Sequence, residues 1–102
     1  MLELRPNCEM CDKDLPPNAT DACICSYECT FCESCVEKEL KNVCPNCGGG
    51  FAPRPIRPDI AHREGIGLSH QPASDKRVLT RRTKDEIATF VNIMKNIPPE
   101  KR

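Results

Sequence analysis

Short alternations of apolar and polar residues predict a small amount of β-structure in the first half of this chain. Leu2-Glu3-Leu4 has the two-residue period of a strand and predicts a short edge strand. Residues 22–25 predict a second brief strand with Ile24 facing inward. The turn-forming residues between 12 and 21 predict a loop, so we expect small β-hairpins rather than an extended sheet.

A helical pattern follows at residues 34–40. Ser34 is a candidate N-cap, and Glu37 lies three residues later, as in a capping box. The side of this helix that we expect to be buried carries Val36, Leu40 and Val43.

A second helix is predicted at residues 83–97. It opens with the capping-box sequence Thr83-Lys-Asp-Glu86, and Asn96, Pro98 and Pro99 end it. Its apolar face consists of Ile87, Phe90, Val91 and Met94. This face either packs on the chain's own domain or binds a partner, and the spacing does not choose between the two.

The alternating prolines between Phe51 and Pro58 remove hydrogen-bond donors and predict an extended arm. We therefore divide the chain into a domain of residues 1–58, a linker of residues 59–82 with basic side chains, and the helix of residues 83–97. With 102 residues and no Trp, the core is expected to be thin, and such domains usually need disulfides or a metal.

Nine cysteines supply candidates for such cross-links, and several are spaced as Cys-x-x-Cys. That turn lets two thiolates reach one metal ion at about 2.3 Å each. Two four-ligand sites need eight cysteines, so one is spare. One register uses Cys8, Cys11, Cys25, Cys29, Cys32, Cys35, Cys44 and Cys47. The other groups Cys23 with Cys25, Cys29 and Cys32 and leaves Cys35 over. We favour the first, because it starts the helix at a ligand pair and places Phe31 where an aromatic ring packs under the metal.

The residues from Met1 to Pro6 contain no apolar stretch, so we expect neither a secretory signal nor a membrane span and place the chain in the cytoplasm. Thiols stay reduced there, and an odd number of cysteines fits poorly with a closed set of disulfides. We expect two structural zinc ions. An iron–sulfur centre or another metal is the alternative, and disulfides are the least favoured.

Charge differs between the two halves of the chain. Residues 1–50 carry four Lys/Arg and nine Asp/Glu, a net charge of −5, and residues 51–102 carry the balancing +5. Two four-thiolate zinc sites would take the first half to about −9. Such a surface repels phosphate backbones, which argues against nucleic-acid binding by the cysteine-rich domain.

The spacing Cys25-x3-Cys29-x2-Cys32-x2-Cys35, with Cys8-x2-Cys11 before it and Cys44-Pro-x-Cys47 after it, resembles a RING finger. Cys29 stands where that family usually has a histidine. The resemblance implies a small α+β fold with a cross-brace between two zinc sites. One site would then consist of Cys8, Cys11, Cys32 and Cys35, and the other of Cys25, Cys29, Cys44 and Cys47. Two sequential sites remain the alternative.

A wider resemblance, over residues 1–79, is to a family of short bacterial cysteine-rich proteins, domain-of-unknown-function family 1272. The matching segments are 2–8, 14–17, 24–26, 28–32, 43–49, 54–58 and 72–78. Cys23 lies outside the family's pattern, Met10 stands where a cysteine is frequent, and the helix after Arg82 is an extension. The resemblance implies a RING-like zinc fold in a bacterial cytoplasm and no established activity.

We interpret the chain as a non-catalytic zinc module that binds another protein, because four thiolates close each site and no HExxH motif or phosphate-binding loop is present. A ubiquitin-ligase-like adaptor is one alternative, although Gly48 stands where active ligases often carry Arg. Nucleic-acid binding through a basic tail is another, without aromatic residues between the cations to stack bases. That tail comprises Arg54, Arg57, Lys76, Arg77, Arg81, Arg82 and Lys84. The sequence sets neither the partner nor the oligomeric state.

Three further residues have a functional and a plain interpretation. Cys23 is either a reactive thiol beside a metal ligand or an inert one, and we favour the inert thiol. His62 and His70 are interpreted as exposed loop residues rather than ligands, because sulfur already fills both sites.

Overall fold

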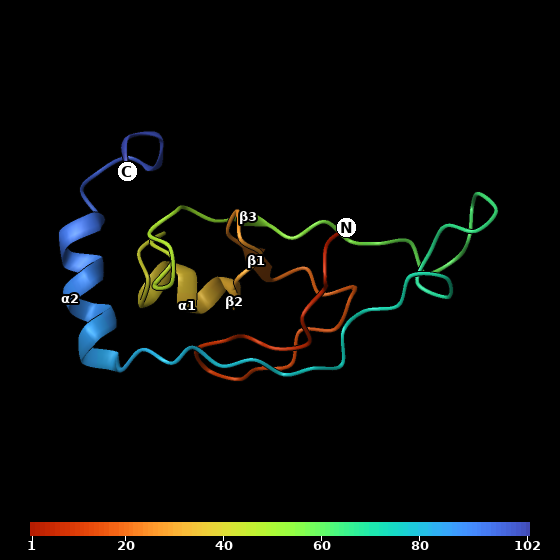
Figure 1. The fold of residues 1–102 in the computed structure, drawn as a ribbon, viewed down its shortest axis with the longest axis horizontal. Helices are drawn as coiled ribbons and strands as arrows, with labels where there is room; N and C mark the ends of the chain where they lie inside the picture. Colours follow the sequence, from red (N-terminus) through yellow and green to blue (C-terminus); the bar gives the residue numbers. More distant parts are fainter.

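The computed structural model describes residues 1–102 as an elongated molecule with extents of 47 × 26 × 18 Å (Figure 1). The strands are β1 (Ala22–Ile24), β2 (Thr30–Cys32) and β3 (Ala52–Pro53), and the helices are α1 (Glu33–Lys38) and α2 (Lys84–Met94). A 3-10 turn, η1, follows at Pro99–Lys101. The sheet and α1 form the centre of the molecule. Helix α2 lies at one end of the molecule. The loop that follows β3 projects at the other end, and the chain then returns along the domain.

The three strands form an antiparallel sheet in the order β2-β1-β3. Strands β1 and β2 make a hairpin in which Cys23 pairs with Phe31, and β3 pairs with the other edge of β1. This is the small α+β fold that was expected, with two helices and two groups of cysteines. Within β1, however, Ala22 is the buried residue, and Ile24 is only half-buried.

Two expectations for the first half are wrong in detail. Leu2-Glu3-Leu4 forms no strand, because Leu4 turns the chain with a φ of 57°, and the β-pairing nearby is an isolated bridge between Asn7 and Asp14. Helix α1 has no capping box. Its N-cap is Cys32, at the end of β2, and the carbonyl of Asp21 instead accepts a hydrogen bond from the first helical N–H, on Glu33, at 2.8 Å.

The core lies where the sheet meets α1. Phe31, Leu40 and Val43 have no exposed surface, and the ring of Phe31 meets that of Phe51 edge-to-face at 5.4 Å. Because most of the other buried side chains in this cluster are cysteines, few apolar side chains hold the fold together. A core this thin supplies little stability by itself.

Helix α2 has the predicted capping box, in which Thr83 and Glu86 exchange side-chain to backbone hydrogen bonds. It ends earlier than expected, at Met94. Ile87 and Val91 are buried against the domain, and Phe90 and Met94 pack at its edge. Of the two interpretations of the apolar face, the structure therefore has the helix docked on its own chain.

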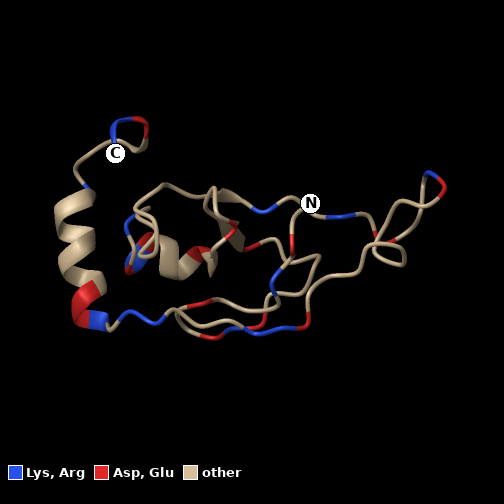
Figure 2. Ribbon diagram, viewed as in Figure 1, with Lys and Arg blue, Asp and Glu red and all other residues tan.

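The segment before α2 runs back along the N-terminal residues (Figure 1). Its backbone donates from Ser74 to the carbonyl of Glu3 at 3.1 Å and from Thr80 to the carbonyl of Glu9 at 2.8 Å. Figure 2 shows basic residues of this segment beside acidic residues of the N-terminal loop, where Arg77 forms ion pairs with Asp12 and Asp14. The division at residues 58 and 82 stays a prediction.

Candidate metal centre

The first cysteine group joins two regions of the chain. Cys8 and Cys11 come from the N-terminal loop, and Cys32 and Cys35 come from the junction of β2 and α1. All four sulfur atoms lie within 4.8 Å of one another, which is close enough for one ion to contact all of them. We call this set cluster one.

The second group brings Cys25, which follows β1, to Cys44 and Cys47, which precede β3, again with all sulfur atoms within 4.8 Å of one another. Cys29 does not meet that distance limit, but its thiol contacts those of Cys44 and Cys25 through hydrogen bonds. We call these four residues cluster two. The groups alternate along the chain, as in the cross-brace, and are not sequential.

Two loops of the same construction carry the paired ligands. Knuckle one is Cys8–Lys13 and knuckle two is Cys44–Gly49. In knuckle one, the N–H of Asp12 donates to the carbonyl of Cys8 at 2.9 Å, and the N–H of Cys8 donates to the carbonyl of Lys13 at 2.8 Å. Knuckle two repeats these bonds, from Gly48 to Cys44 at 2.7 Å and from Cys44 to Gly49 at 2.8 Å.

The residue after the second cysteine has a positive φ in both knuckles, 63° at Asp12 and 83° at Gly48. Glycine adopts this conformation without strain, and aspartate tolerates it better than most residues. Backbone N–H groups also point at the sulfur atoms. Cys11 donates to the Sγ of Cys8 at 3.5 Å, and Gly49 donates to the Sγ of Cys47 at 3.4 Å. These donors favour thiolates over thiols.

Without an ion, the thiols of cluster two do not ionise together. The hydrogen bond from Cys44 lowers the pKa of Cys29 to about 5, and the same contact raises the pKa of Cys44. Burial raises the pKa of Cys25 to about 11 and also raises that of Cys35 in cluster one. One thiolate is therefore stabilised at the expense of its neighbours, and only a cation among the sulfur atoms would allow all four to be charged.

Sequence analysis missed Glu9, which lies between the two cysteines of knuckle one. Its side chain is 2% exposed and accepts hydrogen bonds from the backbone of Thr30 and from Arg5 at 2.9 Å. These bonds fix knuckle one to β2, beside the cluster that both elements share. A single glutamate in a loop belongs to no apolar repeat and to no cysteine spacing, so no sequence pattern could have identified Glu9.

Cys23 lies in β1 outside both clusters and is half-buried. Burial and the nearby Glu33 raise its pKa, which disfavours the reactive thiolate. The register that groups Cys23 with Cys32 would need Cys32 to leave Cys8 and Cys11, with which the structure places it. His62 and His70 lie exposed in the projecting loop.

Several basic side chains of the predicted tail are engaged within the chain. Arg54 is buried and donates to the carbonyls of Arg5, Leu15 and Pro16. Arg57 donates to the carbonyls of Gln71 and Leu2, at 2.7 and 2.8 Å. With Arg77 paired to two carboxylates, these three arginines brace the fold.

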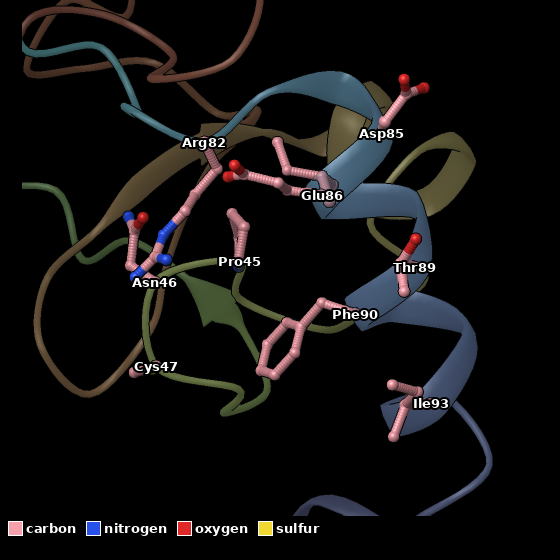
Figure 3. Close-up of a pocket in the computed structure, with 10 residues that line it drawn as sticks. Pro45, Asn46, Cys47, Arg82, Asp85, Glu86, Thr89, Phe90 and Ile93 are labelled. Carbon is pink, nitrogen blue, oxygen red and sulfur yellow. The ribbon is translucent and has the colours of Figure 1, made fainter.

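A cavity of about 690 Å³ lies between knuckle two and α2 (Figure 3). Phe90 and Arg82 point into it from the helix side, and Pro45 and Asn46 face them from the knuckle. Cys47, an exposed member of cluster two, lies at its rim. The cavity therefore gives access from solvent to one side of cluster two.

The fold and its clusters define a small cysteine-rich α+β protein with two groups of thiols that are able to hold metal ions. The chain belongs to the family described as protein of unknown function DUF1272, whose model matches residues 1–57. It is also similar to uncharacterized protein R02474 of Rhizobium meliloti (strain 1021), with 54% identity over 79 residues, 78% of this chain and 87% of that protein. No solved structure matches. The family resemblance is confirmed, and α2 lies outside the matched residues. No helix of the chain has the length and apolar character needed to cross a membrane.

Proposed function

We propose that the chain is a non-catalytic module that binds two zinc ions and presents a folded surface to another protein. The observation that carries the proposal is the pair of interleaved thiol clusters at Cys8, Cys11, Cys32 and Cys35 and at Cys25, Cys29, Cys44 and Cys47. Four thiolates around each ion match the tetrahedral preference of zinc. Such a site is closed, with no position for water or substrate, which supports a structural rather than a catalytic role.

Zinc would supply what the thin core lacks. Structural zinc contributes on the order of 10–16 kcal/mol in finger peptides, which exceeds the stability of most small domains. The backbone N–H groups of Cys11 and Gly49, which donate to the sulfur atoms of Cys8 and Cys47, fit thiolate ligands, as do the paired knuckles. The same donors suit iron–sulfur clusters, so the metal itself has to be measured.

The experiment is native mass spectrometry with elemental analysis on protein purified without added metal. Two zinc ions per chain, with unfolding on chelation, are the expected result. Iron with visible absorbance would contradict the structural role and would indicate a role in electron transfer instead. One ion per chain would mean that one of the clusters is not a metal site.

The structure weighs against the two alternative functions. Nucleic-acid binding through the whole basic tail would need all seven of its cations free, whereas Arg54, Arg57 and Arg77 are engaged within the chain. A ligase-like adaptor would need an open knuckle, whereas Phe90 and Met94 of α2 pack against Gly48.

Contact with another protein is tested by cross-linking in cells followed by mass spectrometry. Tyr27 and Ile93 are large, exposed side chains near the cavity of knuckle two, and Ile60 is an exposed side chain on the remote loop. If the partner docks near the cavity, Ile93→Glu removes specific cross-links that Ile60→Glu retains. An identical cross-link pattern for both variants and the unmodified chain would contradict this part of the proposal.

A further inference from the structure

An arginine from the C-terminal half donates to the same position of each knuckle. The Nη2 of Arg77 donates to the carbonyl oxygen of Asp12 at 2.7 Å. The Nη1 of Arg102 donates to the carbonyl oxygen of Gly48 at 3.1 Å. Asp12 and Gly48 are the equivalent residues that follow the second cysteine and turn the chain with a positive φ. Two arginines 25 residues apart therefore hold the same turn in two separate loops.

Each arginine also donates to two further acceptors, which fix the direction of its side chain. Arg77 donates to the side chains of Asp12 and Asp14, at 2.8 and 2.7 Å. Arg102 donates to the carbonyls of Asn42 and Ile97, at 2.8 Å each. A planar guanidinium with several donors suits such a multiple contact, which a lysine ammonium would not reproduce.

Thr80 lies on the segment between the two arginines and contacts both knuckles. Its N–H donates to the carbonyl of Glu9, in knuckle one, at 2.8 Å. Its hydroxyl donates to the Oδ1 of Asn46, in knuckle two, at 3.2 Å. All three residues that make these contacts lie beyond position 57, where the match to the family model ends. The part of the chain that the family model does not match thus contacts both knuckles.

In each knuckle, the residue whose carbonyl the arginine holds directly follows the exposed cysteine of the cluster. Cys11 and Cys47 are exposed, whereas their partners Cys8 and Cys44 are fully buried. A competing chelator or thiol reaches the exposed sulfur first, and the loop must open at that cysteine for the ion to leave. A bond that holds the next residue in its turn opposes that opening.

We propose that Arg77 and Arg102 are positioning residues that each keep one knuckle closed and so set the rate at which its metal ion is released. Arg77 controls cluster one, and Arg102 controls cluster two. This inference rests on the proposed function, because it needs an ion in each cluster. It concerns the rate of release rather than the number of ions bound.

The test measures zinc transfer to an excess of a chromogenic chelator from the full chain and from Arg77→Ala and Arg102→Ala. Alkylation during the transfer, mapped by peptide mass spectrometry, identifies which knuckle opens. We expect each variant to accelerate release from its own cluster about threefold or more, the size of a modest exposed ionic contact for Arg77 and of a single net hydrogen bond for Arg102. In Arg77→Ala the early alkylation falls on Cys11, and in Arg102→Ala it falls on Cys47.

Arg81→Ala is the matched control, because Arg81 lies on the same segment and its side chain is exposed. It should leave both rates unchanged. Equal acceleration of both clusters by either alanine variant would indicate general destabilisation and overturn the inference, as would unchanged rates in both. If an alanine variant does not fold, the same comparison is made with Arg77→Lys and Arg102→Lys, which keep the charge. The zinc content of the unmodified chain tests the proposed function separately, because the inference concerns only differences between variants that start with two ions.

Discussion

The docking of α2 can be tested by substituting Ile87 with alanine. Ile87 is 3% exposed, and it lies one turn before Val91, the other buried residue of the helix. If these two side chains hold α2 on the domain, shortening one should release the helix while leaving the cysteine clusters intact.

The expected loss of stability follows from the number of buried carbon atoms that the substitution removes. Ile87→Ala removes three carbon atoms, each worth about 0.8 kcal/mol when buried, or about 2.4 kcal/mol in total. Any cavity that remains adds to this, within the range of about 2–5 kcal/mol found for such substitutions. A detached helix of 11 residues is marginal in water, so α2 should unfold when it leaves the domain. A loss of about 2.4 kcal/mol raises the population of the open state about fifty-fold.

Amide hydrogen exchange on the metal-loaded protein measures this opening directly, because exchange follows the population of the open state. We expect exchange at the amides of residues 88–91 to rise about fifty-fold, and exchange in β1 and β2 to stay unchanged. Ile93→Ala is the control. Ile93 is 64% exposed on the same helix, and its replacement should alter stability by less than about 0.5 kcal/mol.

Two results would refute this reasoning. An equal rise in β1 and β2 would mean that α2 and the domain unfold as one cooperative unit. No rise in α2 would mean that Ile87 does not hold the helix, and that the capping box of Thr83 and the contacts of Arg102 suffice.

Three further predictions concern the clusters and the core. Cys44→Ser should reduce the zinc content from two ions to one, whereas Cys23→Ser should leave two, as measured by native mass spectrometry, because Cys23 lies outside both clusters. Phe31→Ala should lower the free energy of unfolding by about 3–5 kcal/mol in a denaturant titration, because its ring is fully buried. Arg54→Met should lower it by at least about 2 kcal/mol in the same assay, because it leaves the carbonyls of Arg5 and Leu15 without a donor, whereas that of Pro16 keeps the N–H of Ala19. A loss below about 0.5 kcal/mol for Arg54→Met would show that water replaces the guanidinium.

The sequence was most informative where one residue type determines the local structure. The Thr83–Glu86 capping box is a short pattern with a single geometry, and the structure has both of its hydrogen bonds. Cysteine spacing similarly predicted that the paired cysteines of the two knuckles lie together, because a Cys-x-x-Cys turn brings two thiolates within reach of one ion. Cys29 and Cys32 have the same spacing but belong to different clusters, so spacing alone does not determine the grouping.

The expectations were poorer where contacts between distant segments decide the outcome. Ser34 and Glu37 match a capping box, but β2 leads directly into α1, and Asp21 supplies the acceptor instead. The arginines were interpreted as a basic tail because a sequence shows charge and not its partners. Arg54 reaches carbonyls 38 to 49 residues away and Arg57 reaches carbonyls 14 and 55 residues away, and no local pattern indicates these contacts.

The alternation of the two clusters has a consequence for the order of folding. All four cysteines of cluster one have been synthesised once the ribosome has passed Cys35, whereas cluster two is incomplete until Cys47. An ion in cluster one closes the loop between Cys11 and Cys32, and Cys25 and Cys29 lie inside that loop. Closing a loop reduces the chain entropy that remains to be lost. The first ion should therefore prepare half of the second site before the chain that completes it has left the ribosome.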